Sequence, residues 1–101
     1  MGNKRKKLEV KPSDIRMGDV ASINYKGELV DKGAEQVYIH YGYDGWNDIG
    51  DLPMRKQDDG SFQVQIKAIG TTEIDMCFRD DNNQWDNNDG IDYRIGIDED
   101  Y

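Results

Sequence analysis

Cysteine is almost absent from this 101-residue sequence, which limits both its covalent structure and its cellular location. Cys77 is the single cysteine, so the chain cannot form an internal disulfide. Because free thiols are more typical of reducing compartments than of secreted proteins, we expect a cytoplasmic location. A module excised from a secreted enzyme would instead be extracellular.

Long apolar runs are also missing. No stretch approaches the roughly 20 apolar residues of a membrane-spanning helix. No apolar run follows the basic cluster near the start of the sequence, as it would in a secretory signal. We therefore expect neither a signal peptide nor a membrane partner.

Positive charge is in short supply. The chain has 13 Lys and Arg against 21 Asp and Glu, for a formal net charge of -8. Proteins that bind nucleic acids gain much of their affinity from Lys and Arg that replace counterions around phosphates, so we expect no nucleic-acid partner. The basic run Lys4–Lys7 is the exception, and we interpret it as a solvated N-terminal arm.

What the sequence does contain is a repeated alternation of apolar and polar residues over short windows, separated by turn residues. The length suits one domain with one modest core. No window sustains a helical period, so the pattern predicts an all-β fold, and the regular spacing of short strands favours a β-sandwich. We assign residues 1–16 to the basic arm and a short first strand, and residues 17–101 to the sandwich. The expected strands lie at residues 8–11, 20–25, 36–41, 53–57, 61–67, 73–79 and 91–97.

The alternation also assigns faces, because successive side chains of a strand point to opposite sides of the sheet. In the strand at 36–41, Tyr38 and His40 are predicted to face solvent while their neighbours face the core. Cys77 lies opposite Met76, so we expect a surface thiol without a catalytic base. The predicted core comprises Val37, Ile39, Tyr41, Phe62, Val64, Ile66, Ile74, Met76 and Phe78.

Catalytic signatures are lacking. Glycoside hydrolysis needs two carboxylates across a cleft, and here the acidic residues cluster in turns. No G-x-S-x-G motif accompanies His40 to suggest a serine nucleophile. We expect no enzymatic activity.

The acidic segment near residue 85 superficially resembles a calcium loop. Aligning Gly90 with the glycine of the EF-hand pattern places Trp85 at the first ligand position and Gly96 at the last, so the pattern fails at both ends. A calcium site of another geometry stays open. One histidine and one cysteine do not suit structural zinc. We expect no metal and no cofactor.

Both tryptophans lie in segments rich in Gly, Asn and Asp, where we expect loops that can expose an indole. A pyranose ring has apolar C–H faces and a rim of hydroxyls, so it suits an aromatic plane edged by polar groups. Trp46 and Trp85 could supply the planes, and His40, Asn87 and Asn88 could meet the hydroxyls. Burial of either indole in the sandwich, and a simple turn at 87–90, are the alternatives.

Two motifs then suggest a family. Ile39-His40-Tyr41 followed by Trp46, and the run W-D-N-N-x-G-x-D-Y from Trp85 to Tyr93, resemble the starch-binding carbohydrate-binding modules of families 25 and 53. The Gly18-Asp19-Val20 opening is similar as well.

This resemblance implies an immunoglobulin-like antiparallel β-sandwich that binds α-1,4-glucans such as starch, glycogen and maltooligosaccharides without cleaving them. It also implies that His40, Trp46 and Trp85 form the binding platform, and that Asn87 and Asn88 either bond hydroxyls or shape the loop. The expected partners are the glucan and a linked or associated glucan-active enzyme, and the expected state is a monomer. The alternative function is a β-sandwich that recognises a protein, stabilised by calcium.

Overall fold

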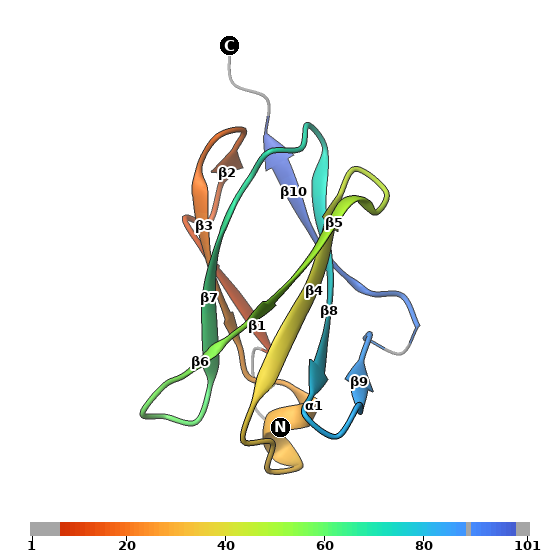
Figure 1. Cartoon of the computed structure of the whole chain (residues 1–101). Helices are drawn as coiled ribbons and strands as arrows, with labels where there is room; N and C mark the ends of the chain where they lie inside the picture. Colours follow the sequence, from red (N-terminus) through yellow and green to blue (C-terminus); the bar gives the residue numbers. More distant parts are fainter. Residues whose placement is uncertain (1–6, 89, 99–101) are drawn as a thin grey trace, which may run out of the picture.

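The alternating residues form two β-sheets packed face to face, seen as two layers in Figure 1. The computed structural model describes residues 7–88 and 90–98. The predicted all-β sandwich is confirmed, with one short helix added. The elements are β1 (Leu8–Lys11), β2 (Ile15–Arg16), β3 (Val20–Tyr25), α1 (Glu28–Asp31), β4 (Val37–Tyr43), β5 (Asn47–Pro53), β6 (Arg55–Lys56), β7 (Phe62–Lys67), β8 (Glu73–Asp80), β9 (Trp85–Asp86) and β10 (Tyr93–Asp98).

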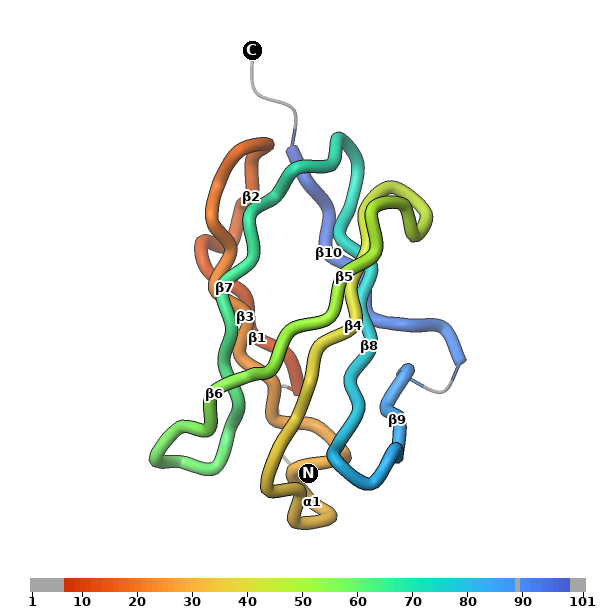
Figure 2. The backbone as a smooth tube through the Cα atoms, viewed as in Figure 1, coloured from red at the N-terminus to blue at the C-terminus, as the bar shows by residue number. Residues whose placement is uncertain are grey.

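The first sheet has the strand order β1-β3-β7-β6, and the second has the order β2-β10-β8-β4-β5. Within the described residues all pairings are antiparallel except that between β2 and β10. The short strand β9 pairs with β8, beside it in Figure 2. Since β4 pairs along one edge of β8, β9 pairs with the opposite edge. The strand β10 pairs with that same edge of β8 at residues 73–76.

The core fills the space between the sheets. Tyr25 of the first sheet stacks on Phe78 of the second, with ring centroids 4.2 Å apart. Ile39 and Phe78 are both fully buried, and the predicted inward faces are confirmed for all three strands, with Tyr41 and Val64 half-buried at the margin. Tyr38 and His40 lie on the opposite face of β4, as predicted.

The helix α1 lies at one end of the sandwich, and the β4–β5 turn extends toward the other end (Figure 1). Leu29 is fully buried there, and its amide donates a hydrogen bond of 3.1 Å to the hydroxyl of Tyr25. Four residues are too few to show a helical period in the sequence, so the pattern gave no sign of α1.

The single strand predicted at 53–57 is wrong. Instead β5 ends at Pro53 in the second sheet and β6 begins at Arg55 in the first, with buried Met54 at the crossing. The sequence of β5, Asn-Asp-Ile-Gly-Asp-Leu-Pro, is rich in residues that strands usually avoid. It forms a strand at the edge of its sheet, where a proline is tolerated.

The other strand predictions hold to within two residues. Besides α1 and most of β5, the sequence pattern missed β2 and β9, each only two residues long. The strand β1 pairs with β3 and β2 pairs with β10, so residues 8–11 and 15–16 join the two sheets. Residues 4–6 of the basic arm lie outside the described part of the chain, and the division at residue 16 stays a prediction.

Among the described residues, none of the helical segments has the length and apolar character that crossing a membrane requires.

The contact between the two sheets gives a first test. Phe78→Ala removes the ring that stacks on Tyr25, and we expect it to lower the free energy of unfolding by about 3 to 5 kcal/mol. Urea unfolding followed by circular dichroism measures this change. Val20→Ala is the control, because Val20 is 55% exposed on the outside of the first sheet and should change stability by less than about 0.5 kcal/mol. Equal losses in the two variants would contradict this account of the core.

Candidate functional site

The outer face of the second sheet carries two adjacent rows of side chains, because residues directly opposite in antiparallel strands share a face. In the first row, Tyr38 of β4 lies opposite Arg79 of β8, which lies opposite Trp85 of β9. In the second row, His40 lies between Asp51 of β5 and Cys77. The register of four strands therefore brings these side chains together.

Three aromatic rings meet on this face. The ring of His40 lies nearly parallel to that of Trp46, at 26° with centroids 5.4 Å apart. The same imidazole meets Trp85 edge-on, at 90° and 5.9 Å. The two indole planes are therefore steeply inclined to each other. Trp85 is 48% exposed and Trp46 is partly exposed, so neither indole belongs to the core.

The turn that carries Trp46 is fixed by a buried carboxylate. Asp75 is fully buried in β8 and accepts hydrogen bonds of 3.0 Å from the amides of Gly45 and Trp46. The guanidinium of Arg94 donates to its other oxygen at 2.9 Å. Burial opposes ionisation of Asp75, but hydrogen bonds from Glu73, Trp46 and Arg94 hold its pKa below the ordinary value. A charged carboxylate thus ties this turn to the sheet.

The sheet beneath Trp46 leaves room for the indole only because residue 42 is glycine. A Cβ atom at Gly42 would lie 3.0 Å from Cα and 3.1 Å from Cε3 of Trp46. The indole therefore packs directly over the backbone of β4, next to His40.

Asp44 holds the same turn from the other side. Its carboxylate accepts hydrogen bonds from the backbone amides of Thr71, Thr72 and Glu73 and from both threonine hydroxyls. These bonds, the Thr71 amide foremost, hold the pKa of Asp44 well below its ordinary value of 3.8. Asp44 and Trp46 both have positive φ angles, 51° and 67°, so the turn keeps a conformation that these contacts must stabilise.

Trp85 points outward because its neighbour points inward. Asp86 is 5% exposed, and its Oδ2 accepts hydrogen bonds from the hydroxyls of Tyr25 at 2.5 Å and Tyr93 at 3.0 Å. Burial and the bond to Asp86 raise the pKa of Tyr25, which therefore stays a neutral donor. Since adjacent residues of a strand face opposite ways, anchoring Asp86 inside directs Trp85 to the surface.

Asn87 and Asn88 follow in the loop to β10, and each of their side chains forms a hydrogen bond within that loop. The Oδ1 of Asn87 accepts from the amide of Gly90 at 3.0 Å, and Nδ2 of Asn88 donates to the carbonyl of Asp92 at 3.1 Å. Asn88 has a positive φ of 56°. These contacts favour the loop-shaping role, while a direct role toward hydroxyls stays a prediction.

Two residues of this face escaped the sequence analysis. The guanidinium of Arg79 lies over the ring of Tyr38 at 4.3 Å and near that of Trp85 at 6.0 Å. Oδ1 of Asp51 lies 2.8 Å from Nδ1 of His40 and accepts a hydrogen bond from it. Asp51 belongs to the missed strand β5, so nothing in the sequence paired it with His40.

The prediction that Cys77 is a surface thiol is wrong. Cys77 does face outward from the sandwich core, opposite Met76, yet it is only 7% exposed. It sits on the central strand β8, between β4 and the β9–β10 segment, and its neighbours cover it. Burial, and the nearby carboxylates of Asp92 and Asp51, raise the pKa of the thiol to about 11. Such a thiol is a poor nucleophile.

A metal centre finds no support in the described ranges. Residues 7–88 and 90–98 contain no group of three or more His, Cys, Asp or Glu side chains arranged to hold an ion. The calcium-loop hypothesis also involved Asp89, which lies outside those ranges.

The described face thus combines two inclined indoles, Trp85 exposed and Trp46 partly exposed, with a histidine and an arginine, and this arrangement has the chemistry to stack on the apolar face of a hydroxyl-bearing ring. Residues 21–76, more than half of the chain, match the starch/carbohydrate-binding module family 53. The chain belongs to this family. It is also 31% identical over 90 residues to an α-amylase of Clostridium acetobutylicum, an alignment covering 88% of this chain and 12% of the amylase. The chain thus spans a small part of that relative.

The close approach at residue 42 gives a test of how Trp46 is positioned. We expect Gly42→Ala to displace the indole and to destabilise the protein by about 1 to 3 kcal/mol, since the new Cβ meets backbone as well as ring. Near-ultraviolet circular dichroism and urea unfolding report these two effects.

The matched control is Gly96→Ala in β10, where a Cβ meets nothing within 4 Å and φ is not positive. An unchanged tryptophan spectrum in Gly42→Ala would show that the indole does not depend on this glycine.

The contacts of Asp44 predict acid sensitivity of the Trp46 turn. Because the pKa of Asp44 is depressed by folding, its stabilisation is fully present above its ordinary value of 3.8 and is lost as the pH falls below it. We expect Asp44→Asn to be less stable than the native protein at neutral pH and to lose less stability between pH 5 and pH 2. Urea unfolding at stepped pH measures both, with exposed Asp81→Asn as the control. Parallel pH profiles for Asp44→Asn and the native protein would contradict the assignment.

Proposed function

We propose that this module binds α-1,4-glucans, namely starch, glycogen and maltooligosaccharides, by stacking glucose units on Trp46 and Trp85. The observation that carries the proposal is the steep angle between the two indoles, set by their parallel and perpendicular contacts with His40. An α-1,4-glucan is curved, so neighbouring glucose units present their faces at an angle. A straight β-1,4-glucan would need two coplanar rings.

Polar groups beside the rings suit the hydroxyl rim of the sugar. His40 is half-buried and paired with Asp51, which orients the imidazole and leaves Nε2 for a hydroxyl. Arg79 lies against both Tyr38 and Trp85 and can donate to hydroxyls from the edge of the platform. Charge–aromatic contacts of this kind also hold the guanidinium in place before the ligand arrives.

We further propose that the module performs no chemistry. Glycoside hydrolysis requires an acid and a second carboxylate on either side of the scissile bond. On the aromatic face, the carboxylate of Asp51 is engaged by His40, and the thiol of Cys77 is buried with a raised pKa. Neither group is suited to act on a sugar stacked on the indoles.

The expected affinity is modest. If each indole shields roughly 50 to 100 Å² of apolar surface, the gross gain is about 1 to 2.5 kcal/mol per glucose unit. Losses of rotational freedom offset much of this gain, so we expect a dissociation constant of about 10 μM to 1 mM. Retention on a polymer then depends on avidity.

The relative in Clostridium acetobutylicum is an α-amylase, and the match covers a small part of its length. We therefore propose that the partner of this module is a glucan-active enzyme, linked or associated, and that the module itself is monomeric. We also propose a cytoplasmic location, in keeping with the lone cysteine.

The test is a titration of ¹⁵N-labelled protein with maltoheptaose, with cellohexaose as the matched sugar. We expect saturable shifts of both indole N–H signals with the α-glucan alone. Trp85→Ala should weaken the binding about 5- to 70-fold, in line with the area that the indole shields. Isothermal calorimetry gives the same ratio independently.

Val20→Ala, at an exposed apolar residue of the other sheet, is the control and should bind like the native protein. Absence of shifts with either sugar would overturn the proposal, and a melting temperature that rises with calcium would then favour the protein-recognition alternative.

A further inference from the structure

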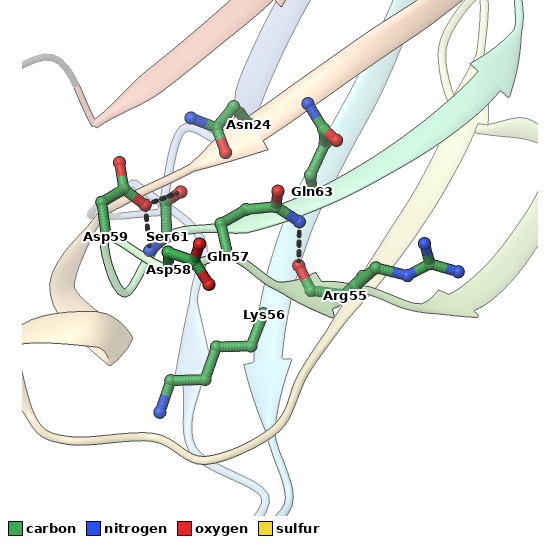
Figure 3. A pocket seen from close by; sticks show the side chains of 8 residues that line it. All are labelled: Asn24, Arg55, Lys56, Gln57, Asp58, Asp59, Ser61 and Gln63. Carbon is green, nitrogen blue, oxygen red and sulfur yellow. Dashed lines mark hydrogen bonds between the residues drawn. The ribbon is translucent and has the colours of Figure 1, made fainter.

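A second recess lies on the opposite side of the sandwich, on the outer face of the first sheet. It has a volume of about 440 Å³ and is lined by residues of β3, β6, β7 and the β6–β7 turn (Figure 3). We call it the Asn24 hollow; the residues used below are Asn24, Arg55, Gln57 and Gln63, with Asp58 and Asp59 at the turn. A smaller hollow of about 310 Å³ adjoins it and shares Arg55 and Gln63.

The register of the first sheet builds this hollow. Asn24 of β3 lies opposite Gln63 of β7, which lies opposite Arg55 of β6. The three side chains therefore form one row on a single face. Their neighbours Tyr25 and Phe62 point the other way and are buried in the core, so the row faces outward.

One atom in the hollow lacks a partner. The Oδ1 of Asn24 is buried and accepts no hydrogen bond from the described residues. Figure 3 shows the Asn24 amide directed toward Gln57, whose own amide nitrogen is occupied by the carbonyl of Arg55. A buried acceptor without a donor is costly, so a ligand that displaces the side chains covering it and brings a hydroxyl or N–H group gains that hydrogen bond.

Two further polar side chains that line the hollow have no hydrogen-bond partner among the described residues. Within the described residues, neither the amide of Gln63 nor the guanidinium of Arg55 forms a side-chain hydrogen bond or ion pair. An amide donates and accepts, while a guanidinium only donates. The row can thus serve several hydroxyl groups at once.

Charge selects the class of ligand. Charges of both signs line the hollow, Arg55 and Lys56 against Asp58 and Asp59. Asp59 is further engaged by two hydrogen bonds from Ser61 and by an ion pair of 3.6 Å with Lys26 just outside the lining. A hollow of mixed charge gives at most a weak net attraction to an anion or a cation. Neutral ligands rich in hydroxyls fit its chemistry best.

We propose that the Asn24 hollow is a second carbohydrate site, which holds a neutral glucan segment by hydrogen bonds alone. The choice of glucan rests on the proposed function of the aromatic face. Because the two sites lie on the outer faces of opposite sheets, one module would contact two glucan segments at once and gain avidity on a branched or packed polymer.

The experiment follows two sets of signals in one titration of the ¹⁵N-labelled protein with maltoheptaose. The indole N–H groups report the aromatic face, and the side-chain NH₂ groups of Asn24, Gln57 and Gln63 report the hollow. We expect both sets to shift and saturate. In Trp85→Ala, the response of the amides should persist while that of the indole platform weakens.

Gln63→Ala is the variant that tests the hollow itself. Loss of one ligand hydrogen bond should weaken the response of the Asn24 amide by roughly three- to tenfold and leave the indole response unchanged. Ser22→Ala is the matched control, because Ser22 lies on the same face of β3, two residues before Asn24, and lines neither hollow.

The outcomes separate the two proposals. Indole shifts without amide shifts, up to the solubility of the sugar, would overturn the second site and leave the aromatic site standing. Amide shifts that Gln63→Ala does not weaken would also overturn it. Amide shifts without indole shifts would overturn the aromatic platform alone.

Discussion

The direction of each tryptophan depends on one buried carboxylate. Asp75, buried on the outer face of β8 beneath the β4–β5 turn, accepts a hydrogen bond from the backbone amide of Trp46. Asp86 accepts hydrogen bonds from two tyrosine hydroxyls on the core side of β9, the strand that carries Trp85. Burying a charge without partners would be prohibitive, so these hydrogen bonds are a condition of the fold as well as of the site. The aromatic face is thus supported by the hydrogen bonds that these two buried carboxylates require.

The sequence predicted much of the fold because most strands have one buried face. A buried face forces alternation, and alternation revealed β3, β7 and β8 and placed His40 outside the core. The alternation pattern failed where a strand does not have one buried face and one exposed face. The edge strand β5 has few apolar residues, and Cys77 lies on an outer face that neighbouring segments cover, so both were misread.

For the candidate site, the sequence indicated which aromatic residues are involved but not how their rings are oriented relative to one another. Composition drew attention to Trp46, Trp85 and His40, while the angle between their rings depends on strand register and on positive φ angles in the turn. Arg79 has no local signature at all, because its contacts arise only when β4, β8 and β9 align. Register is a long-range property that no short window of sequence contains.

A rigid platform matters most for a ligand that offers weak contacts. In the proposed mode of binding, each stacked glucose unit would contribute little, so disorder of the indoles would offset the gain through the entropy lost on binding. The turn at Asp44, the glycine at position 42 and the inward anchor at Asp86 all reduce that loss before the ligand arrives. Affinity in this proposed mode of binding therefore depends on how firmly the planes are held, and their inclination is the feature that would distinguish a curved glucan from a straight one.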